Sequence, residues 1–143
     1  MTNLFRVTLL WTITSLFFCR VYGQFLVTYM EPDWLPALPY WFSGYLEYQY
    51  LLGAQILILM LMAVINVDYF RKAGYFYIQS NKKRVWLKRF CGVYLTVMTL
   101  RLILHFTLFT EQVWYINIIP ISFHWLLAGY LWLLSVDLEK LQK

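Results

Sequence analysis

The sequence predicts an all-α membrane protein whose four transmembrane helices form an antiparallel bundle. Of its 143 residues, 62% are hydrophobic and only 13% are charged, whereas soluble domains average about 25% charged residues. A transmembrane helix needs about 20 mainly apolar residues to cross the hydrocarbon core. Such windows cover residues 4–26, 48–67, 88–109 and 115–136. Because the connections between them are short, we expect residues 1–143 to form a single transmembrane four-helix domain.

The charges separate by sign between the two ends of this predicted bundle. Basic residues gather in and beside the loop 68–87, whereas the connections 27–47 and 110–114 contain acidic residues and no Lys or Arg. The positive-inside rule therefore predicts a cytoplasmic loop 68–87 and cytoplasmic termini. The net charge of +5 is explained by topology and by contact with anionic lipid, so no nucleic-acid partner is expected. The basic residues are Arg71, Lys72, Lys82, Lys83, Arg84, Lys88 and Arg89, and the acidic ones are Glu31, Asp33, Glu47 and Glu111.

The first window has an alternative interpretation as a signal peptide. Residues 1–23 combine an apolar stretch with a small residue, Gly23, at which cleavage could occur. Arg20 directly follows the apolar stretch, which favours retention of the segment as the first helix. Cleavage would instead leave three helices and place the new amino terminus outside.

The connection 27–47 is rich in proline and aromatic residues. Its prolines exclude a long regular helix and favour bends or a short helix at the membrane interface, capping the bundle. The segment is either an aromatic belt or a lid over an outward-facing cavity. In the second case the cap residues Glu31, Asp33, Trp34 and Trp41 would reach the residues beneath them.

Polar residues within the helices gather in the half of the bundle nearest this cap. They are the candidate ligand-binding residues Arg101, His124, His105, Arg20, Gln24, Glu47 and Gln55. Arg101 lies about 20 Å along the third helix, counted at 1.5 Å per residue, and His105 follows it one turn later on the same face. An arginine at this depth is costly unless it is paired or hydrated. Its expected partner is Glu47, Glu31, Asp33, a helix carbonyl or an exogenous anion.

The sequence gives little support for catalytic chemistry. It contains no HExxH, CxxC or GxSxG motif and no glycine-rich phosphate loop, and no metal site is predicted. His105 and His124, on different helices, could ligate a haem b from its two faces, but this is a weak alternative. No cofactor is therefore predicted, with haem b or a quinone as the alternative.

Several motifs resemble those of a family of small bacterial four-span inner-membrane proteins to which no activity is assigned. The similarity covers most of the chain, through RVYGQ, PDWLPALPYWFSGYL, YLLGAQILILMLM, YLTVMTLR and IPISFHWLLAGYL. The resemblance implies a bacterial inner-membrane location and four spans. It implies no function for any residue.

Two functional hypotheses follow from these features. The first is an accessory or binding subunit whose polar pocket, nearest the cap, holds an internal ion-pair network or an anionic lipid-like ligand. The second is a small redox or lipid-modifying membrane enzyme that uses haem b, a quinone or a polyprenyl substrate in the same pocket. The expected partners are the lipid bilayer and a larger membrane-protein complex.

Overall fold

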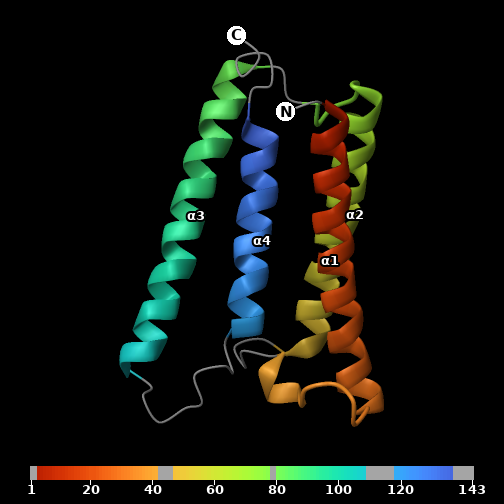
Figure 1. Cartoon of the computed structure of the whole chain (residues 1–143), viewed down its shortest axis with the longest axis vertical. Helices are drawn as coiled ribbons and strands as arrows, with labels where there is room; N and C mark the ends of the chain where they lie inside the picture. Colours follow the sequence, from red (N-terminus) through yellow and green to blue (C-terminus); the bar gives the residue numbers. More distant parts are fainter. Residues whose placement is uncertain (1–2, 42–46, 78–79, 109–117, 137–143) are drawn as a thin grey trace.

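The computed structural model describes residues 3–41, 47–77, 80–108 and 118–136, which form helices and turns without a β-strand. The long helices are α1 (Asn3–Met30), α2 (Tyr48–Arg71), α3 (Asn81–Leu108) and α4 (Ile118–Ser135), and they run in alternating directions along the molecule (Figure 1). A 3₁₀-helix, η1 (Leu38–Tyr40), lies between α1 and α2. The all-α class and the predicted set of four helices are confirmed in the described residues.

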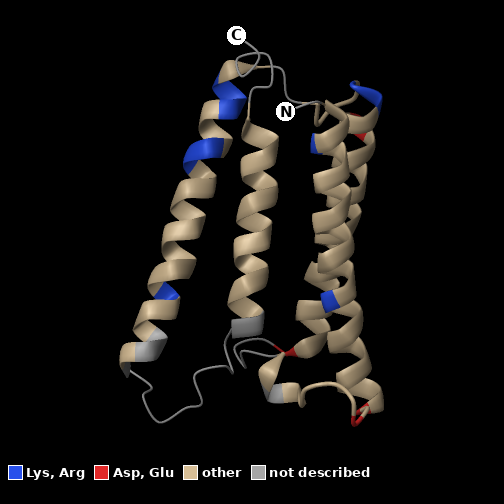
Figure 2. Cartoon of the chain, viewed as in Figure 1, with Lys and Arg blue, Asp and Glu red and all other residues tan. Residues whose placement is uncertain are grey.

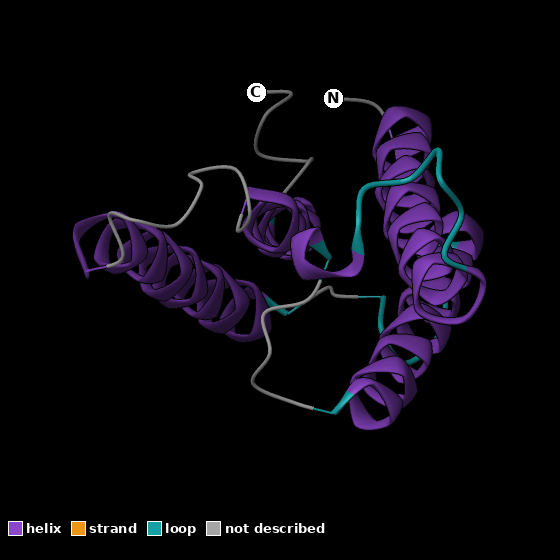
Figure 3. Cartoon of the chain, turned by 90° about the horizontal axis from the view of Figure 1, so that it is seen from below, coloured by secondary structure: helices purple, strands orange, loops and turns teal. Residues whose placement is uncertain are grey.

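The helix α4 lies between α3 on one side and the α1–α2 pair on the other (Figure 3). The main hydrophobic core is built by α1, α2 and α4, whereas α3 packs chiefly on α4. Among the described side chains of α3, only Cys91 is buried, and its thiol donates to the carbonyl of Ala128 at 3.1 Å. The core residues are Val7, Leu10, Phe17, Val21, Met62, Ile65, Tyr69, Tyr130, Leu133 and Leu134.

Apolar residues also cover the outside of the bundle. Leu57 and Met60 on α2 and Val93 on α3 are 68%, 62% and 64% exposed, although an outward face of a soluble helix is normally polar. Among the described residues, α1 and α2 are long and apolar enough to cross a membrane, with mean hydropathies of 1.5 and 2.2. These two helices are therefore candidate membrane spans.

The two ends of the bundle differ in charge, as Figure 2 shows. We call the end that carries the α2–α3 connection the basic end, and the end that carries the α1–α2 connection the cap end. The helix α1 begins and α4 ends at the basic end (Figure 1). Most of the Lys and Arg lie at this end, whereas the cap end carries acidic residues (Figure 2). The charge separation expected from the sequence is therefore present in the fold.

At the basic end, α2 and α3 extend beyond their predicted windows, so the connection between them is shorter than the predicted loop 68–87. The helix α2 continues to Arg71 and α3 already begins at Asn81. The Asp68 carboxylate accepts the Phe76 N–H at 2.9 Å. Gly74, with a φ of 109°, leaves room for that carboxylate, since a Cβ there would collide with it. Hydropathy windows end where polar residues begin, but helical hydrogen bonding continues until such a turn.

The cap is correspondingly shorter than the predicted segment 27–47. The helix α1 continues to Met30, and the chain leaves it at Glu31, whose φ is 44°. A positive φ at a residue other than glycine marks a sharp change of direction. The described part of the cap is therefore the turn that contains η1.

Candidate functional site

A buried arginine lies on α1 toward the cap end. Arg20 is only 8% exposed, and Gln24, one turn later on the same face, is fully buried. The Arg20 Nη1 donates to the Gln24 Oε1 at 2.9 Å. Because removing a guanidinium from water is costly, the arrangement of its partners is the main clue to what this region does.

Gln24 links three segments of the chain. Its Oε1 also accepts from the Gln55 Nε2 on α2 at 3.0 Å, and its Nε2 donates to the carbonyl of Trp41 at 3.3 Å. The Arg20 Nη2 donates to the same carbonyl at 3.4 Å. We call Arg20, Gln24, Gln55 and the Trp41 carbonyl the arginine–glutamine cluster. It joins α1, α2 and the cap.

The side chain of Trp41 fixes the cap against α1. Its indole N–H donates to the carbonyl of Pro36 at 2.9 Å, which closes the turn around η1. The ring also lies against Gly23, where an added Cβ would be 2.8 Å from the ring. The absence of a side chain at Gly23 therefore leaves room for the ring, and the sequence did not predict this role.

The other predicted cap residues do not join the cluster. Glu31, Asp33 and Trp34 are exposed, Trp34 by 74%. Glu47 is also exposed and precedes α2 without a side-chain capping bond. Within the described residues, the cap therefore reaches the cluster through the Trp41 backbone rather than through a carboxylate.

His124 on α4 is bonded to α3. Its Nδ1 lies 2.6 Å from the Tyr94 hydroxyl, and the two rings meet edge to face at 6.0 Å. The adjacent Phe123 points toward α1, with the Arg20 guanidinium 5.3 Å from its ring centroid, within range of a cation–π interaction. Two consecutive residues of α4 thus contact Arg20 on α1 and Tyr94 on α3.

Arg101 on α3 is half-buried and interacts electrostatically with His124, as Arg20 does. The helix α4 packs on both α1, which carries Arg20, and α3, which carries Arg101. The structure therefore brings the predicted Arg20, Gln24 and Gln55 into direct contact. Phe123 brings α4 against Arg20, and the adjacent His124 interacts electrostatically with Arg101 on α3.

Of the two histidines predicted as alternative haem ligands, the structure describes the side chain of His124 only. The side chain of His105 lies outside the described residues, as does Glu111. His124 uses its Nδ1 for Tyr94, which leaves its Nε2 for another partner. No three His, Cys, Asp or Glu residues in the described part of the chain come together as a metal site. The haem, quinone and enzyme alternatives remain predictions.

A second buried polar cluster, which the sequence did not predict, lies farther toward the basic end. The Asn66 Nδ2 on α2 donates to the Thr14 hydroxyl at 2.9 Å, and the Tyr130 hydroxyl on α4 donates to the Asn66 Oδ1 at 2.8 Å. Asn66 is fully buried. We call these three residues the asparagine cluster. The sequence offers one sign of this cluster: Asn66 lies near the end of the second apolar window, four residues after Met62 and three before Tyr69, so the three share one helix face.

A further contact ties the start of α1 to the end of α4 at the basic end. The Arg6 Nη2 donates to the carbonyl of Val136, and its guanidinium lies 5.4 Å from the centroid of the Tyr69 ring. The Tyr69 hydroxyl donates to the carbonyl of Leu134 at 3.3 Å. Cations at a helix carboxyl end are favourable because the helix dipole is negative there.

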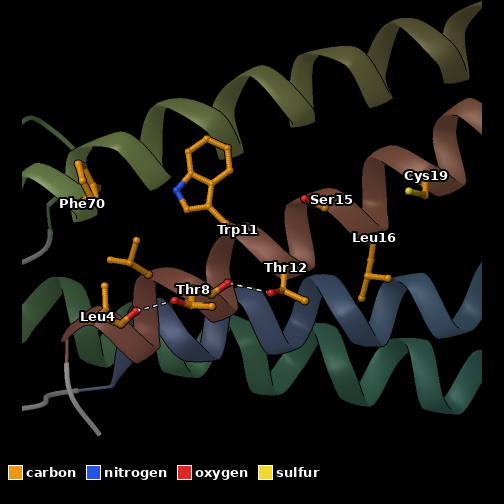
Figure 4. A pocket seen from close by; sticks show the side chains of 9 residues that line it. Leu4, Thr8, Trp11, Thr12, Ser15, Leu16, Cys19 and Phe70 are labelled. Carbon is orange, nitrogen blue, oxygen red and sulfur yellow. Dashed lines mark hydrogen bonds between the residues drawn. The ribbon is translucent and has the colours of Figure 1, made fainter.

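A groove of about 560 Å³ lies along α1 and is lined by none of the residues of the two clusters (Figure 4). Its two threonine hydroxyls bond within the helix: Thr8 donates to the carbonyl of Leu4 at 3.0 Å, and Thr12 to that of Thr8 at 2.9 Å. The groove is therefore an apolar furrow rather than a polar site. Its lining residues are Leu4, Val7, Thr8, Trp11, Thr12, Ser15, Leu16, Cys19 and Phe70.

Comparison of this chain with models of protein families, with curated proteins and with solved structures found no match.

Proposed function

We propose that this protein is a four-span protein of a bacterial inner membrane, with both termini and the basic end in the cytoplasm and the cap end outside. The apolar outer faces of α2 and α3 support contact with lipid. The charge separation between the two ends (Figure 2) supports this orientation.

A carboxyl-terminal reporter fusion tests the orientation. Fluorescent protein at the carboxyl terminus is expected to fold and fluoresce, whereas alkaline phosphatase at the same position is expected to be inactive, because it requires the oxidising outer compartment. Active phosphatase with a dark fluorescent fusion would reverse the proposed topology.

Within this topology, the function best supported is that of an accessory or binding protein that holds an anionic lipid-like ligand near the outer surface. The observation that carries it is Arg20, which is 8% exposed and bonded to Gln24 and a carbonyl. No described carboxylate pairs with it. An arginine at the bilayer centre costs about 3 kcal/mol on insertion scales and more than 10 in simulations. The cost is smaller near the outer surface, but a counter-anion would still stabilise a guanidinium as buried as that of Arg20.

An internal ion-pair network is the other hypothesis for this pocket. The positions of Glu31, Asp33 and Glu47 favour the ligand instead, because all three carboxylates are exposed and a salt bridge exposed to water contributes little. Arg101, which interacts electrostatically with the His124 beside Phe123, adds positive potential, which further favours an incoming anion.

Native mass spectrometry of the purified protein, followed by extraction of its lipids, tests this function. The wild type is expected to retain an anionic lipid, and Arg20→Gln to lose it by about ten- to a hundredfold, since a hydrogen bond to a charged group is worth about 1.5–3 kcal/mol. Lys88→Gln is the matched control, because it removes one positive charge from an exposed position of α3.

The control variant is expected to retain lipid as the wild type does. Equal retention by Arg20→Gln, or a wild type without anionic lipid, would contradict the function.

A further inference from the structure

The arginine–glutamine cluster contains one buried donor and one buried acceptor that the described residues leave without a hydrogen-bond partner. They are the Arg20 Nε and the Gln55 Oε1. Both residues are more than nine-tenths buried. The Arg20 Nη1 and the Gln55 Nε2 both donate to one atom, the Gln24 Oε1, at 2.9 and 3.0 Å. Buried polar atoms of this kind are rare in proteins, and each calls for an explanation.

The carbonyl of Trp41 lies where other donors of the cluster converge. It accepts from the Arg20 Nη2 at 3.4 Å and from the Gln24 Nε2 at 3.3 Å. Both distances exceed the usual 2.7–3.2 Å of such bonds, so both bonds are weak. An anionic oxygen at this position would form shorter bonds with the same two donors. An anion that replaced this carbonyl would therefore break only two weak hydrogen bonds of the cluster.

The beginning of α4 adds to the attraction for an anion. This 18-residue helix begins at the cap end (Figure 1), and its second turn supplies Phe123, which faces Arg20. The amino end of a helix carries partial positive charge and unpaired N–H groups. An anion held by Arg20 would therefore also interact favourably with α4.

We propose that the arginine–glutamine cluster binds a phospholipid whose headgroup carries a hydroxyl beside its phosphate, or whose phosphate itself keeps a proton. The phosphate accepts from Arg20 and Gln24 in place of the Trp41 carbonyl, and the hydroxyl donates to the Gln55 Oε1. This inference rests on the proposed function, because it specifies the headgroup of the anionic ligand. A choline headgroup offers a phosphate to Arg20 and Gln24 but has no donor for the Gln55 Oε1, and its quaternary ammonium cancels the charge of the phosphate.

Exchange of defined lipids onto the delipidated full-length protein, followed by native mass spectrometry, tests the proposal. The probes carry identical acyl chains: phosphatidylglycerol and phosphatidic acid have a donor, phosphatidylmethanol is anionic without one, and phosphatidylcholine is neutral overall. Phosphatidylglycerol or phosphatidic acid is expected to bind about two- to tenfold more tightly than phosphatidylmethanol, the value of one net hydrogen bond. Whichever of the two exceeds phosphatidylmethanol identifies the donor as the headgroup hydroxyl or the phosphate proton.

The variant Gln55→Met assigns the donor preference to its acceptor. It is expected to abolish the preference over phosphatidylmethanol while phosphatidylmethanol still exceeds phosphatidylcholine. Persistence of the donor preference in this variant would overturn the proposed role of Gln55. The wild-type comparison needs no substitution, so it decides the headgroup requirement even if the variant does not fold.

The outcomes separate the two levels of the proposal. Equal binding of all three anionic lipids, each above phosphatidylcholine, would overturn the headgroup requirement and leave the anion-binding function standing. Binding of phosphatidylcholine as tight as that of the anionic lipids would overturn both.

Discussion

The two buried polar clusters of the bundle differ in how completely their atoms are bonded. In the asparagine cluster, each polar side-chain atom of Thr14, Asn66 and Tyr130 has a partner within the described residues. In the arginine–glutamine cluster, a charged residue has no described carboxylate partner, and Arg20 and Gln55 each leave one polar atom unbonded. A fully bonded buried network stabilises one packing arrangement, whereas an incompletely bonded one lowers stability unless something binds to it.

The difference also follows from what each cluster joins. Asn66 connects α1 and α4 through neutral groups in the middle of the main core. The arginine–glutamine cluster joins two helices to the cap, and its contacts with the cap are its longest. A site that exchanges a ligand needs a weakly held side, because its opening must be possible without unfolding the bundle.

The largest expected effect is that of deleting residues 1–23, which removes Thr14 from one cluster and Arg20 from the other. The segment also supplies Leu10, Phe17 and Val21 to the core. We expect the shortened protein not to assemble, and the mature protein in cells to keep this segment. Intact-mass measurement of the purified protein checks the second point. A mature chain beginning after Gly23 would support the signal-peptide interpretation, and each cluster would then lack one of its residues.

The next effect is that of Asn66→Ala on stability. It removes two hydrogen bonds and leaves a small cavity among α1, α2 and α4. Interhelical bonds in membranes average about 0.6 kcal/mol, so with the cavity we expect the free energy of unfolding to fall by about 2 kcal/mol. Unfolding titration in mild detergent measures this. Val67→Ala, at a neighbouring exposed position, is the control and should change little.

Arg20→Met should not lower the free energy of unfolding as Asn66→Ala does. It replaces a buried charge by an apolar side chain of similar length, so we expect the delipidated protein to be as stable as the wild type or more stable by about 1 kcal/mol. The same unfolding titration measures it. A loss of stability comparable to that of Asn66→Ala would show that Arg20 is a structural residue and would erase the contrast between the clusters.

The smallest expected effect is that of Gly23→Ala on ligand binding. The added methyl group would press on the Trp41 ring, moving the cap carbonyl away from Arg20 and Gln24. Loss of a weak competing bond, about 0.5 kcal/mol, should raise the affinity for anionic lipid about twofold. Gly53→Ala is the matched control, because nothing lies within 4 Å of its Cβ position. Weaker binding by Gly23→Ala would instead make the cap part of the binding surface.

The sequence by itself determined that there are four helices, where they lie along the chain, and at which end of the bundle each sign of charge gathers. Apolar windows and the spacing of charges fix these properties, because each depends on position along the chain. The gathering of Arg20, Gln24 and Gln55 near the cap followed from the same count of residues per turn. The extension of α2 and α3 beyond their windows did not follow, since it depends on the turn held by Asp68 and Gly74.

Only the tertiary structure decided which polar groups touch. Depth along a helix does not specify its rotation or its neighbours, which packing sets. The sequence therefore emphasised Arg101, whereas the structure places α3 at the edge of the bundle and makes Gln24 the centre of the hydrogen bonds. It likewise could not tell that Asn66 is satisfied by Thr14 and Tyr130, because these partners come from helices far apart in the chain.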